Sequence, residues 1–251
     1  MSQPPITTSA ILSQFPALRF GMSTRKGGTS PEPLGMNLSY RVGDDRACVE
    51  ENRRRFFGAL GFASQRSAIP HQCHSDRIEC VTGPGDYESC DGLVTATRNL
   101  PLVITVADCL PVVLYDPKAG VVANVHAGWR GSTKAIVRKA VTLMQNQFGA
   151  SPETIVAYLG PSAGVCCYEV GREVAEVFAP EHHQVRGDKT YLDLKLANRD
   201  QLLRSGLKPM NIEVSAACTI CASEAFHSYR RDRERSGRMM AVVSIVEAKG
   251  L

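Results

Sequence analysis

The clearest indication of the fold is the stretch LPLVITVADCLPVVLYDPKAGVVANVHAGWRG at residues 100–131. It holds three short apolar runs rich in β-branched residues, at 102–106, 112–115 and 121–125, and each run is bounded by Pro, Asp or Gly. Such runs are typical of buried strands. Pro101, Asp108 and Pro111 interrupt the apolar stretch at 100–115, so it does not predict a membrane-spanning helix. We therefore expect a chain whose centre is rich in strands.

Helix and strand patterns alternate irregularly on either side of this centre. Apolar residues at helical spacing predict helices at 44–60, 132–148, 171–178 and 194–203, the second of them capped by Ser132 or Thr133. Further strands are predicted at 93–96, 155–159, 212–216 and 240–246. The irregular order favours an α+β fold over regular βαβ units. Because no repeat or long linker divides the chain, we expect residues 1–251 to form a single domain.

Composition and charge narrow the class of protein. Of the 251 residues, 43% are hydrophobic and 22% are charged, so intrinsic disorder does not describe the chain. A net charge of +4 suits an anionic small substrate but is low for a nucleic-acid-binding domain. Nine cysteines without signal-peptide features predict reduced thiols in the cytoplasm, used for metal binding or catalysis. We expect neither a nucleic-acid nor a membrane partner, and a homodimer stays open.

Histidine and cysteine residues stand in three segments at or near the ends of strand-like runs. They are His71, Cys73 and His74 in PHQCH, Cys109 in ADC, and His126 in HAGWRG. Imidazole and thiolate are the preferred ligands of Zn²⁺, and three of them leave a fourth position open, as in catalytic sites. His74, Cys109 and His126 are the candidate ligands of Zn²⁺, with Cu²⁺ as the alternative ion and His71 and Cys73 as competing ligands. The alternative of a buried, metal-free Cys109 beside a hydrogen-bonded His126 stays open.

Six motifs occur in the order in which a known family carries them. They are HQxH at 71–74, ADCLPV at 107–112, HAGWRG at 126–131, LGP at 159–161, CT at 218–219 and SYRRD at 228–232. From about residue 23 to about residue 246 the chain resembles the laccase-domain family of YfiH and the peptidoglycan editing factor PgeF. The resemblance implies a laccase-like domain with mixed β-sheets flanked by helices, similar to the cytotoxic necrotizing factor fold.

The resemblance also implies an activity and its residues. Family members are described as purine nucleoside phosphorylases, here expected to act on adenosine, inosine, guanosine and also methylthioadenosine, with adenosine deaminase activity. The resemblance also places the metal on His74, Cys109 and His126, which would then be the catalytic residues as well. Phosphorolysis needs a phosphate site, and arginine binds phosphate through paired hydrogen bonds. The candidates are Arg25, Arg53, Arg130 and Arg230, each with the alternative of a solvated surface charge.

Three other functions stay open at this level. A copper polyphenol oxidase, after the family's older name, needs a second copper cluster that six histidines do not easily supply. A cysteine hydrolase or amidase that edits peptidoglycan precursors would use Cys109 as its nucleophile and a histidine as its base. A zinc-stabilised binding module without activity is the third. Cys218 and Cys221 form a CxxC pair that is either a metal or redox pair or two ordinary cysteines.

Overall fold

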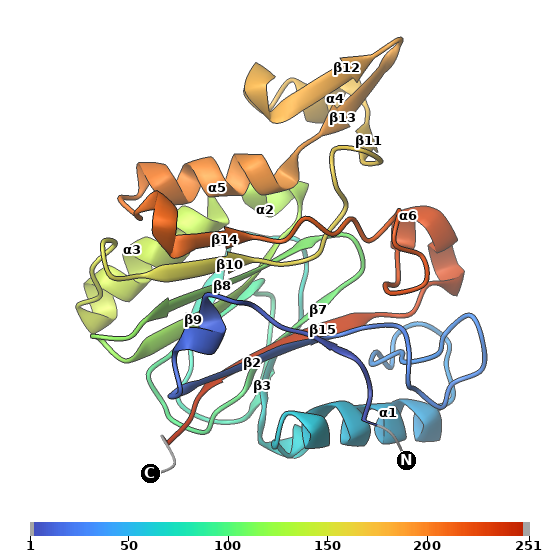
Figure 1. Ribbon diagram of the computed structural model, residues 1–251, viewed down its shortest axis with the longest axis vertical. Helices are drawn as coiled ribbons and strands as arrows, with labels where there is room; N and C mark the ends of the chain where they lie inside the picture. Colours follow the sequence, from blue (N-terminus) through green and yellow to red (C-terminus); the bar gives the residue numbers. More distant parts are fainter. Residues whose placement is uncertain (1–2, 248–251) are drawn as a thin grey trace.

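Two six-stranded sheets are the frame of the structure, a computed structural model that describes residues 3–247 (Figure 1). The first sheet has, in spatial order, β1 (Ile6–Thr7), β2 (Leu18–Ser23), β15 (Met239–Ile245), β7 (Leu102–Val106), β3 (Ala68–Pro70) and β5 (Gly85–Tyr87). The second has β14 (Ile212–Val214), β10 (Val156–Leu159), β8 (Leu110–Asp116), β9 (Val121–Ala127), β6 (Gly92–Thr95) and β4 (Ile78–Cys80). Both sheets mix parallel and antiparallel pairs, as predicted for an α+β domain.

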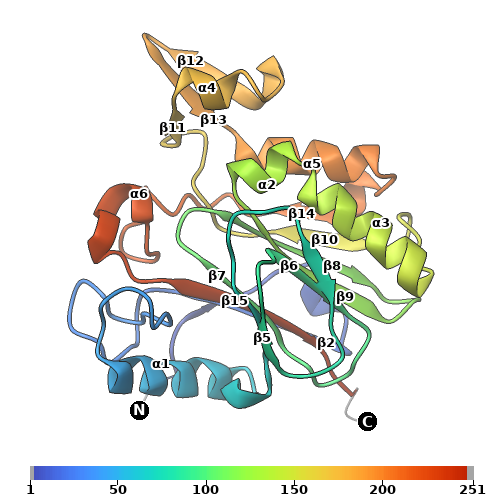
Figure 2. The ribbon, with the colours of Figure 1, turned by 180° about the vertical axis from the view of Figure 1, so that it is seen from behind.

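Helices cover the outer face of each sheet (Figure 2). The helix α1 (Arg46–Ala59) packs on the first sheet, and α3 (Ile136–Phe148), with α2 (Trp129–Thr133) and α5 (Leu194–Arg204) beside it, packs on the second. A small sheet of β11 (Glu169–Val170), β13 (Lys189–Leu192) and β12 (His183–Arg186) projects from this body with α4 (Arg172–Ala175). The remaining helical segments are α6 (Tyr229–Asp232) and the short 3-10 turns Leu12–Gln14, Ser64–Arg66, Pro180–His182, Pro209–Asn211 and Arg233–Arg235.

The predicted helices differ from the observed ones mainly around residue 135. Asp45 caps α1 by accepting hydrogen bonds from the backbone of Ala47 and Cys48, and this helix lies within the predicted range. The helix predicted at 132–148 is two helices, because Ala135 has a φ of 56° in the left-handed region. Ser132 is therefore buried inside α2 and caps nothing. No helix within residues 3–247 is long and apolar enough to cross a membrane.

The chain passes from the first sheet to the second at three places. Residues 88–91 join β5 to β6, and the two passages here named the first and second crossings join β3 to β4, through residues 71–77, and β7 to β8, through residues 107–109. Between the sheets lies a core of apolar side chains from both, which includes Leu93 and Val113 of the second sheet and Leu102 of the first. The two crossings carry the HQCH and ADC motifs, so the fold brings these motifs to one edge of the core.

One buried amide connects the two sheets by hydrogen bonds. Asn124, on β9 of the second sheet, is fully buried, and its Nδ2 donates to the carbonyl oxygens of Leu102 and Ala241, both at 2.9 Å. These acceptors lie on neighbouring strands of the first sheet. The amide therefore fixes the position of one sheet relative to the other in a layer that is otherwise apolar.

We predict that Asn124→Ala lowers the free energy of unfolding by about 2–4 kcal/mol, because two buried hydrogen bonds are lost and a cavity remains. Asn146→Ala is the matched control, since Asn146 is exposed on α3, and it should change stability by less than about 0.5 kcal/mol. Urea denaturation of the three proteins measures the difference. Equal stabilities for all three would contradict the structural role of Asn124.

Candidate functional site

Three possible metal ligands meet beside the two crossings between the sheets. His74 lies on the first crossing, Cys109 on the second, and His126 near the end of β9, opposite Pro111 of β8. One donor atom from each residue lies within 4.8 Å of the donor atoms of the other two. The rings of His74 and His126 pack edge to face with their centroids 5.1 Å apart. Three such donors fit one divalent ion and leave an open coordination position.

The carboxylate of Asp91 forms hydrogen bonds that position two of the three possible ligands, His74 and His126. Its carboxylate is fully buried, and Oδ1 lies 2.8 Å from Nδ1 of His126. The same oxygen accepts the backbone N–H of His74 at 3.0 Å, while Oδ2 accepts the backbone N–H of Ser75 at 2.6 Å and its hydroxyl at 2.8 Å. Because Nδ1 of His126 is engaged, Nε2 is the nitrogen that remains for a metal or for Cys109. A carboxylate behind a histidine ligand is the usual way in which proteins orient such a ligand.

Gly128 leaves room for the three side chains. A Cβ atom placed on it would lie 3.1 Å from Sγ of Cys109 and 3.2 Å from Cδ2 of His74. Both distances are shorter than ordinary van der Waals contacts, so the glycine of the HAGWRG motif is a spatial requirement. Its φ of −74° is open to any residue, so backbone conformation does not demand a glycine here.

The electrostatics of the group favour a thiolate. Burial by itself would raise the pKa of the Cys109 thiol, but the neighbouring imidazoles of His126 and His74 outweigh burial and lower that pKa to about 6. Burial opposes a charge on His126, yet Cys109 and Asp91 together raise the pKa of this imidazole. Burial would likewise raise the pKa of Asp91, but hydrogen bonds from His126 and Ser75 hold it well below its ordinary value. Cys109 is thus prepared for the form that binds metal.

The two competing ligands of the HQCH motif, His71 and Cys73, contact acidic side chains. His71 lies 2.6 Å from Glu88 through Nδ1, and Sγ of Cys73 lies 3.6 Å from Oδ2 of Asp91. Gln72 pairs with the backbone of Thr105 on β7 through both its amide oxygen and its amide nitrogen, at 2.7 and 2.8 Å. The motif is therefore attached to the first sheet by Gln72, which leaves His74 as its member in the three-donor group.

Asp108 connects the site to the C-terminal part of the chain. Its carboxylate accepts hydrogen bonds from the hydroxyls of Thr219 at 2.6 Å and Ser228 at 3.0 Å, and from the backbone N–H of Arg230 at 2.6 Å. Its φ is 86°, a conformation that costs energy in a residue other than glycine. All these bonds serve to position Arg230 and its neighbours beside Cys109.

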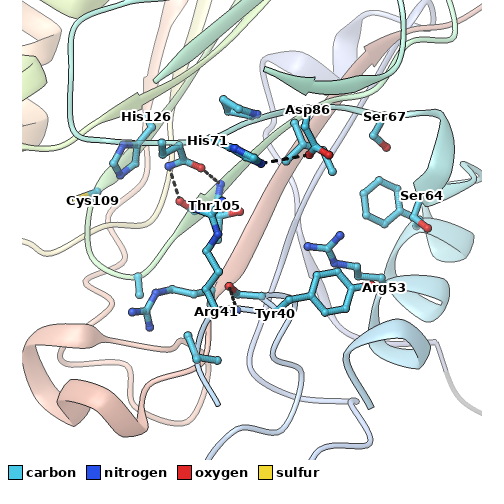
Figure 3. Close-up of a pocket in the computed structure, with 18 of the residues that line it drawn as sticks. Tyr40, Arg41, Arg53, Ser64, Ser67, His71, Asp86, Thr105, Cys109 and His126 are labelled. Carbon is cyan, nitrogen blue, oxygen red and sulfur yellow. Dashed lines mark hydrogen bonds and ion pairs between the residues drawn. The ribbon is translucent and has the colours of Figure 1, made fainter. Parts of the chain in front are cut away.

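An open cavity of about 1720 Å³ extends from the three donors across the face of the first sheet. Figure 3 shows His126 and Cys109 at one end, and Tyr40, Arg41 and Arg53 along the opposite wall. Aromatic side chains line the cavity together with charged ones, namely Tyr40, Phe57, Phe62, Trp129, Tyr168 and Tyr229. The cavity is therefore large enough for a substrate with both a flat apolar part and a charged part.

Six arginines line the cavity, against four acidic residues, Glu50, Glu51, Asp86 and Asp108. The arginines that line it are Arg41, Arg53, Arg54, Arg130, Arg230 and Arg238. Arg54 pairs with Glu51, but none of the other five forms an ion pair with any residue in 3–247. Burial lowers the pKa of Arg53 and of Arg238, so the charges of these two are poorly hydrated. An anion in the cavity would find partners whose charge is already desolvated.

Arg25 was predicted to bind phosphate with the other arginines, but it is not among the residues that line the cavity. Its guanidinium donates to the carbonyl oxygens of Ser223 and Pro33, each at 2.9 Å, and forms an ion pair with Glu32 at 2.9 Å. These contacts fasten two loops to each other. The other predicted arginines, at 53, 130 and 230, do line the cavity.

We predict that Asp91→Asn lowers the affinity of the three-donor group for added Zn²⁺ about 10- to 100-fold, because an amide cannot orient His126 and the 73–75 backbone as the carboxylate does. The matched control is Asp188→Asn, at an exposed turn between β12 and β13, which should bind zinc like the unchanged protein. Competition with a chromophoric chelator measures both affinities. Unchanged affinity in Asp91→Asn would show that the buried carboxylate does not orient the ligands.

Comparison with known proteins agrees with this geometry. A family model described as multi-copper polyphenol oxidoreductase laccase matches residues 19–246. The chain is 42% identical to the purine nucleoside phosphorylase of Deinococcus radiodurans over 241 residues, which cover 93% of this chain and 92% of that protein. It is 35% identical to adenosine deaminase RL5 from an unknown prokaryotic organism, over 81% of this chain and 84% of that one.

The fold agrees with a solved structure as well. The crystal structure of YlmD from Geobacillus stearothermophilus superimposes with a TM-score of 0.89 at 35% identity, covering 95% of this chain and 94% of that one. Residues 19–246, which the family model matches, include the second sheet, the first sheet apart from β1 and Leu18, both crossings and every residue that lines the cavity. The resemblance that the six motifs indicated is thus confirmed, and the chain belongs to the multi-copper polyphenol oxidoreductase laccase family.

Proposed function

We propose that this protein is a zinc-dependent purine nucleoside phosphorylase that also deaminates adenosine. The observation that carries the proposal is one cavity with a His–Cys–His group at one end and unpaired arginines along its walls. The names of relatives at 42% and 35% identity, a purine nucleoside phosphorylase and an adenosine deaminase, support the same two activities. Adenosine, inosine and guanosine, and also methylthioadenosine, are the proposed substrates.

The donor set favours zinc over copper. Two imidazoles and a thiolate suit either ion, but oxidation of phenols by a multicopper enzyme needs a further cluster of histidines. Within residues 3–247, the only other group of possible ligands consists of four cysteines. When bound by His74, Cys109 and His126, zinc would supply Lewis acidity and lower the pKa of a water molecule to about 7. Asp91 would hold His126 in place throughout the reaction.

The arginines have the role of binding the nucleophile. In phosphorolysis an oxygen of phosphate forms a bond to C1′ of the ribose, the bond from C1′ to N9 of the purine breaks, and the purine leaves with a proton. Positive charge develops at C1′, so phosphate held close to it stabilises the transition state. Arg53, Arg130 and Arg230 are the proposed phosphate-binding residues, and the desolvated Arg238 joins them.

The aromatic residues suit the purine base. Trp129, Tyr168 and Tyr229 line the cavity near the His–Cys–His group. Arg130 packs against the Trp129 ring at 4.4 Å and Arg230 against the Tyr168 ring at 5.2 Å, so charge and aromatic surface alternate there. A nucleoside needs both kinds of partner, the aromatic face for its base and the charge for the phosphate that attacks its sugar.

The lowered pKa of Cys109 favours a second candidate, a metal-free cysteine hydrolase or amidase. The thiolate would attack an amide carbonyl and His126 would donate the proton to the leaving nitrogen. The zinc content of freshly purified protein separates the two candidates, because an ion on Cys109 blocks its use as a nucleophile. One zinc on this group supports the phosphorylase.

Removal of zinc should abolish phosphorolysis of inosine, and added Zn²⁺ should restore it. Cys109→Ala and His126→Ala should each lower kcat/KM for inosine at least about 100-fold, because either change destroys the three-ligand site. Cys80→Ala is the matched control and should keep full activity, since Cys80 is exposed on β4. Hypoxanthine and ribose 1-phosphate are measured together by chromatography.

Two outcomes would overturn the proposal. Full activity of the metal-free protein would remove zinc from the mechanism. Release of free ribose without phosphate would show hydrolysis in place of phosphorolysis.

Loss of a phosphate-binding arginine should raise the KM for phosphate and leave the KM for inosine nearly unchanged. Arg53→Ala, Arg130→Ala and Arg230→Ala are each expected to raise it about tenfold or more, the cost of one charge-assisted hydrogen bond. Arg172→Ala, on the outer helix α4, is the control, because that arginine pairs with Glu176 in solvent. Initial rates at varied phosphate give both constants. Normal phosphate constants in all three variants would place the anion elsewhere.

A further inference from the structure

Four cysteines gather where two connections run side by side. Cys166 and Cys167 lie between β10 and β11, and Cys218 and Cys221 lie between β14 and α6. Since β10 and β14 are parallel neighbours, both connections leave the second sheet at the same end, as Figure 1 shows. A β-bridge between Ser162 and Cys218 joins them there.

The four sulfur atoms are spaced for one ion. All four lie within 4.8 Å of one another, with Sγ of Cys221 at 3.0 Å from that of Cys167 and at 3.4 Å from that of Cys166. In a tetrahedral zinc site each sulfur is about 2.3 Å from the ion, so sulfurs lie about 3.8 Å apart. A disulfide bond would need about 2.05 Å, and all four cysteines are free. The spacing therefore fits a single ion.

The surroundings of the sulfurs suit a negatively charged centre. The backbone N–H of Gly164 donates to Sγ of Cys218 at 3.3 Å. The ammonium group of Lys195 is buried and bonds the carbonyl oxygens of Ser215 at 2.7 Å and Ala217 at 2.6 Å, close enough to Cys218 to interact with its charge. Four thiolates around a divalent ion carry two net negative charges, so a nearby buried cation and an N–H donor stabilise them.

Gly164 supplies the room that the sulfurs need. A Cβ atom on this residue would lie 3.2 Å from Cβ of Cys218 and 3.3 Å from Sγ of Cys166, tighter than ordinary contacts. The backbone of the first connection thus passes directly against the cysteines of the second.

We propose that Cys166, Cys167, Cys218 and Cys221 form a second zinc site, distinct from the His–Cys–His group. All four coordination positions would be filled by protein sulfur, so this site has a structural role and no open position for substrate. The proposal does not depend on the phosphorylase activity, because it rests on the sulfur geometry alone.

The site would hold two parts of the cavity wall in place. Tyr168 follows Cys167 directly and lines the cavity. Thr219 lies between the other two cysteines and donates its hydroxyl to Asp108, the neighbour of Cys109. Zinc on the four sulfurs would thus fasten the residues beside the candidate active site without touching the substrate.

Metal content of variants tests the proposal. The protein is produced in zinc-supplemented medium, purified with a phosphine reductant and no chelator, and its zinc and iron are measured by inductively coupled plasma mass spectrometry. The unchanged protein should hold two zinc ions per chain, and the control Cys80→Ser should also hold two. Cys218→Ser with Cys221→Ser should hold one, and Cys109→Ser with His126→Ala should hold one.

Cobalt gives a readout that does not depend on activity or on the first metal group. Co²⁺ bound to four thiolates has intense thiolate charge-transfer absorption. This absorption should persist in the Cys109→Ser, His126→Ala protein and disappear when Cys166→Ser and Cys167→Ser are added to it, a pair near the surface whose fold is checked by circular dichroism.

Several results would overturn the second site. They are a single zinc per chain that the Cys109→Ser, His126→Ala change removes completely, iron in place of zinc on the four cysteines, or a disulfide between Cys167 and Cys221 in protein purified without reductant. Inactive protein that still binds two zinc ions would contradict the phosphorylase proposal and leave this one standing.

Discussion

The buried carboxylate of Asp91 is the contact on which the site depends. It is fully excluded from solvent, and both of its oxygens are used. One oxygen orients His126 from β9 and the backbone of His74 from the first crossing, so two segments far apart in sequence share one anchor. Burying a carboxylate costs free energy, and hydrogen bonds offset that cost only when both of its oxygens accept them, as they do here. The second crossing places Cys109 beside these two histidines.

The fold explains why the chemistry is at this edge. The chain leaves the first sheet for the second three times. Two of these passages carry a candidate metal ligand, His74 or Cys109, and the third carries Asp91, which contacts His126 and the backbone of His74. Asn124, two residues before His126, joins the two sheets by hydrogen bonds and so fixes their relative position near the site. The carboxylate of Asp108 accepts a hydrogen bond from the backbone N–H of Arg230, which positions Arg230 in the cavity wall. A metal group and a set of cationic side chains are thus brought together by backbone topology.

Part of this arrangement could be predicted from sequence and part could not. The apolar runs predicted the central strands, and the motifs predicted which His and Cys residues meet, because strand ends and turn residues leave local signals. The break at Ala135 was missed, because a left-handed alanine has no sequence signal. The role of Asp91 was missed too, although an acidic residue directly before the buried strand β6 was a visible sign. The contacts of Arg25 outside the cavity were not predicted, since one of its partners, Ser223, lies far from it along the chain.

Crystals of protein that phosphorolyses inosine allow the metal group to be located by anomalous diffraction at the zinc absorption edge. We expect an ion about 2.3 Å from Sγ of Cys109 and about 2.1 Å from one ring nitrogen of His74 and of His126, with one position left for substrate or water. Active crystals in which no anomalous scatterer lies between these three side chains would contradict it.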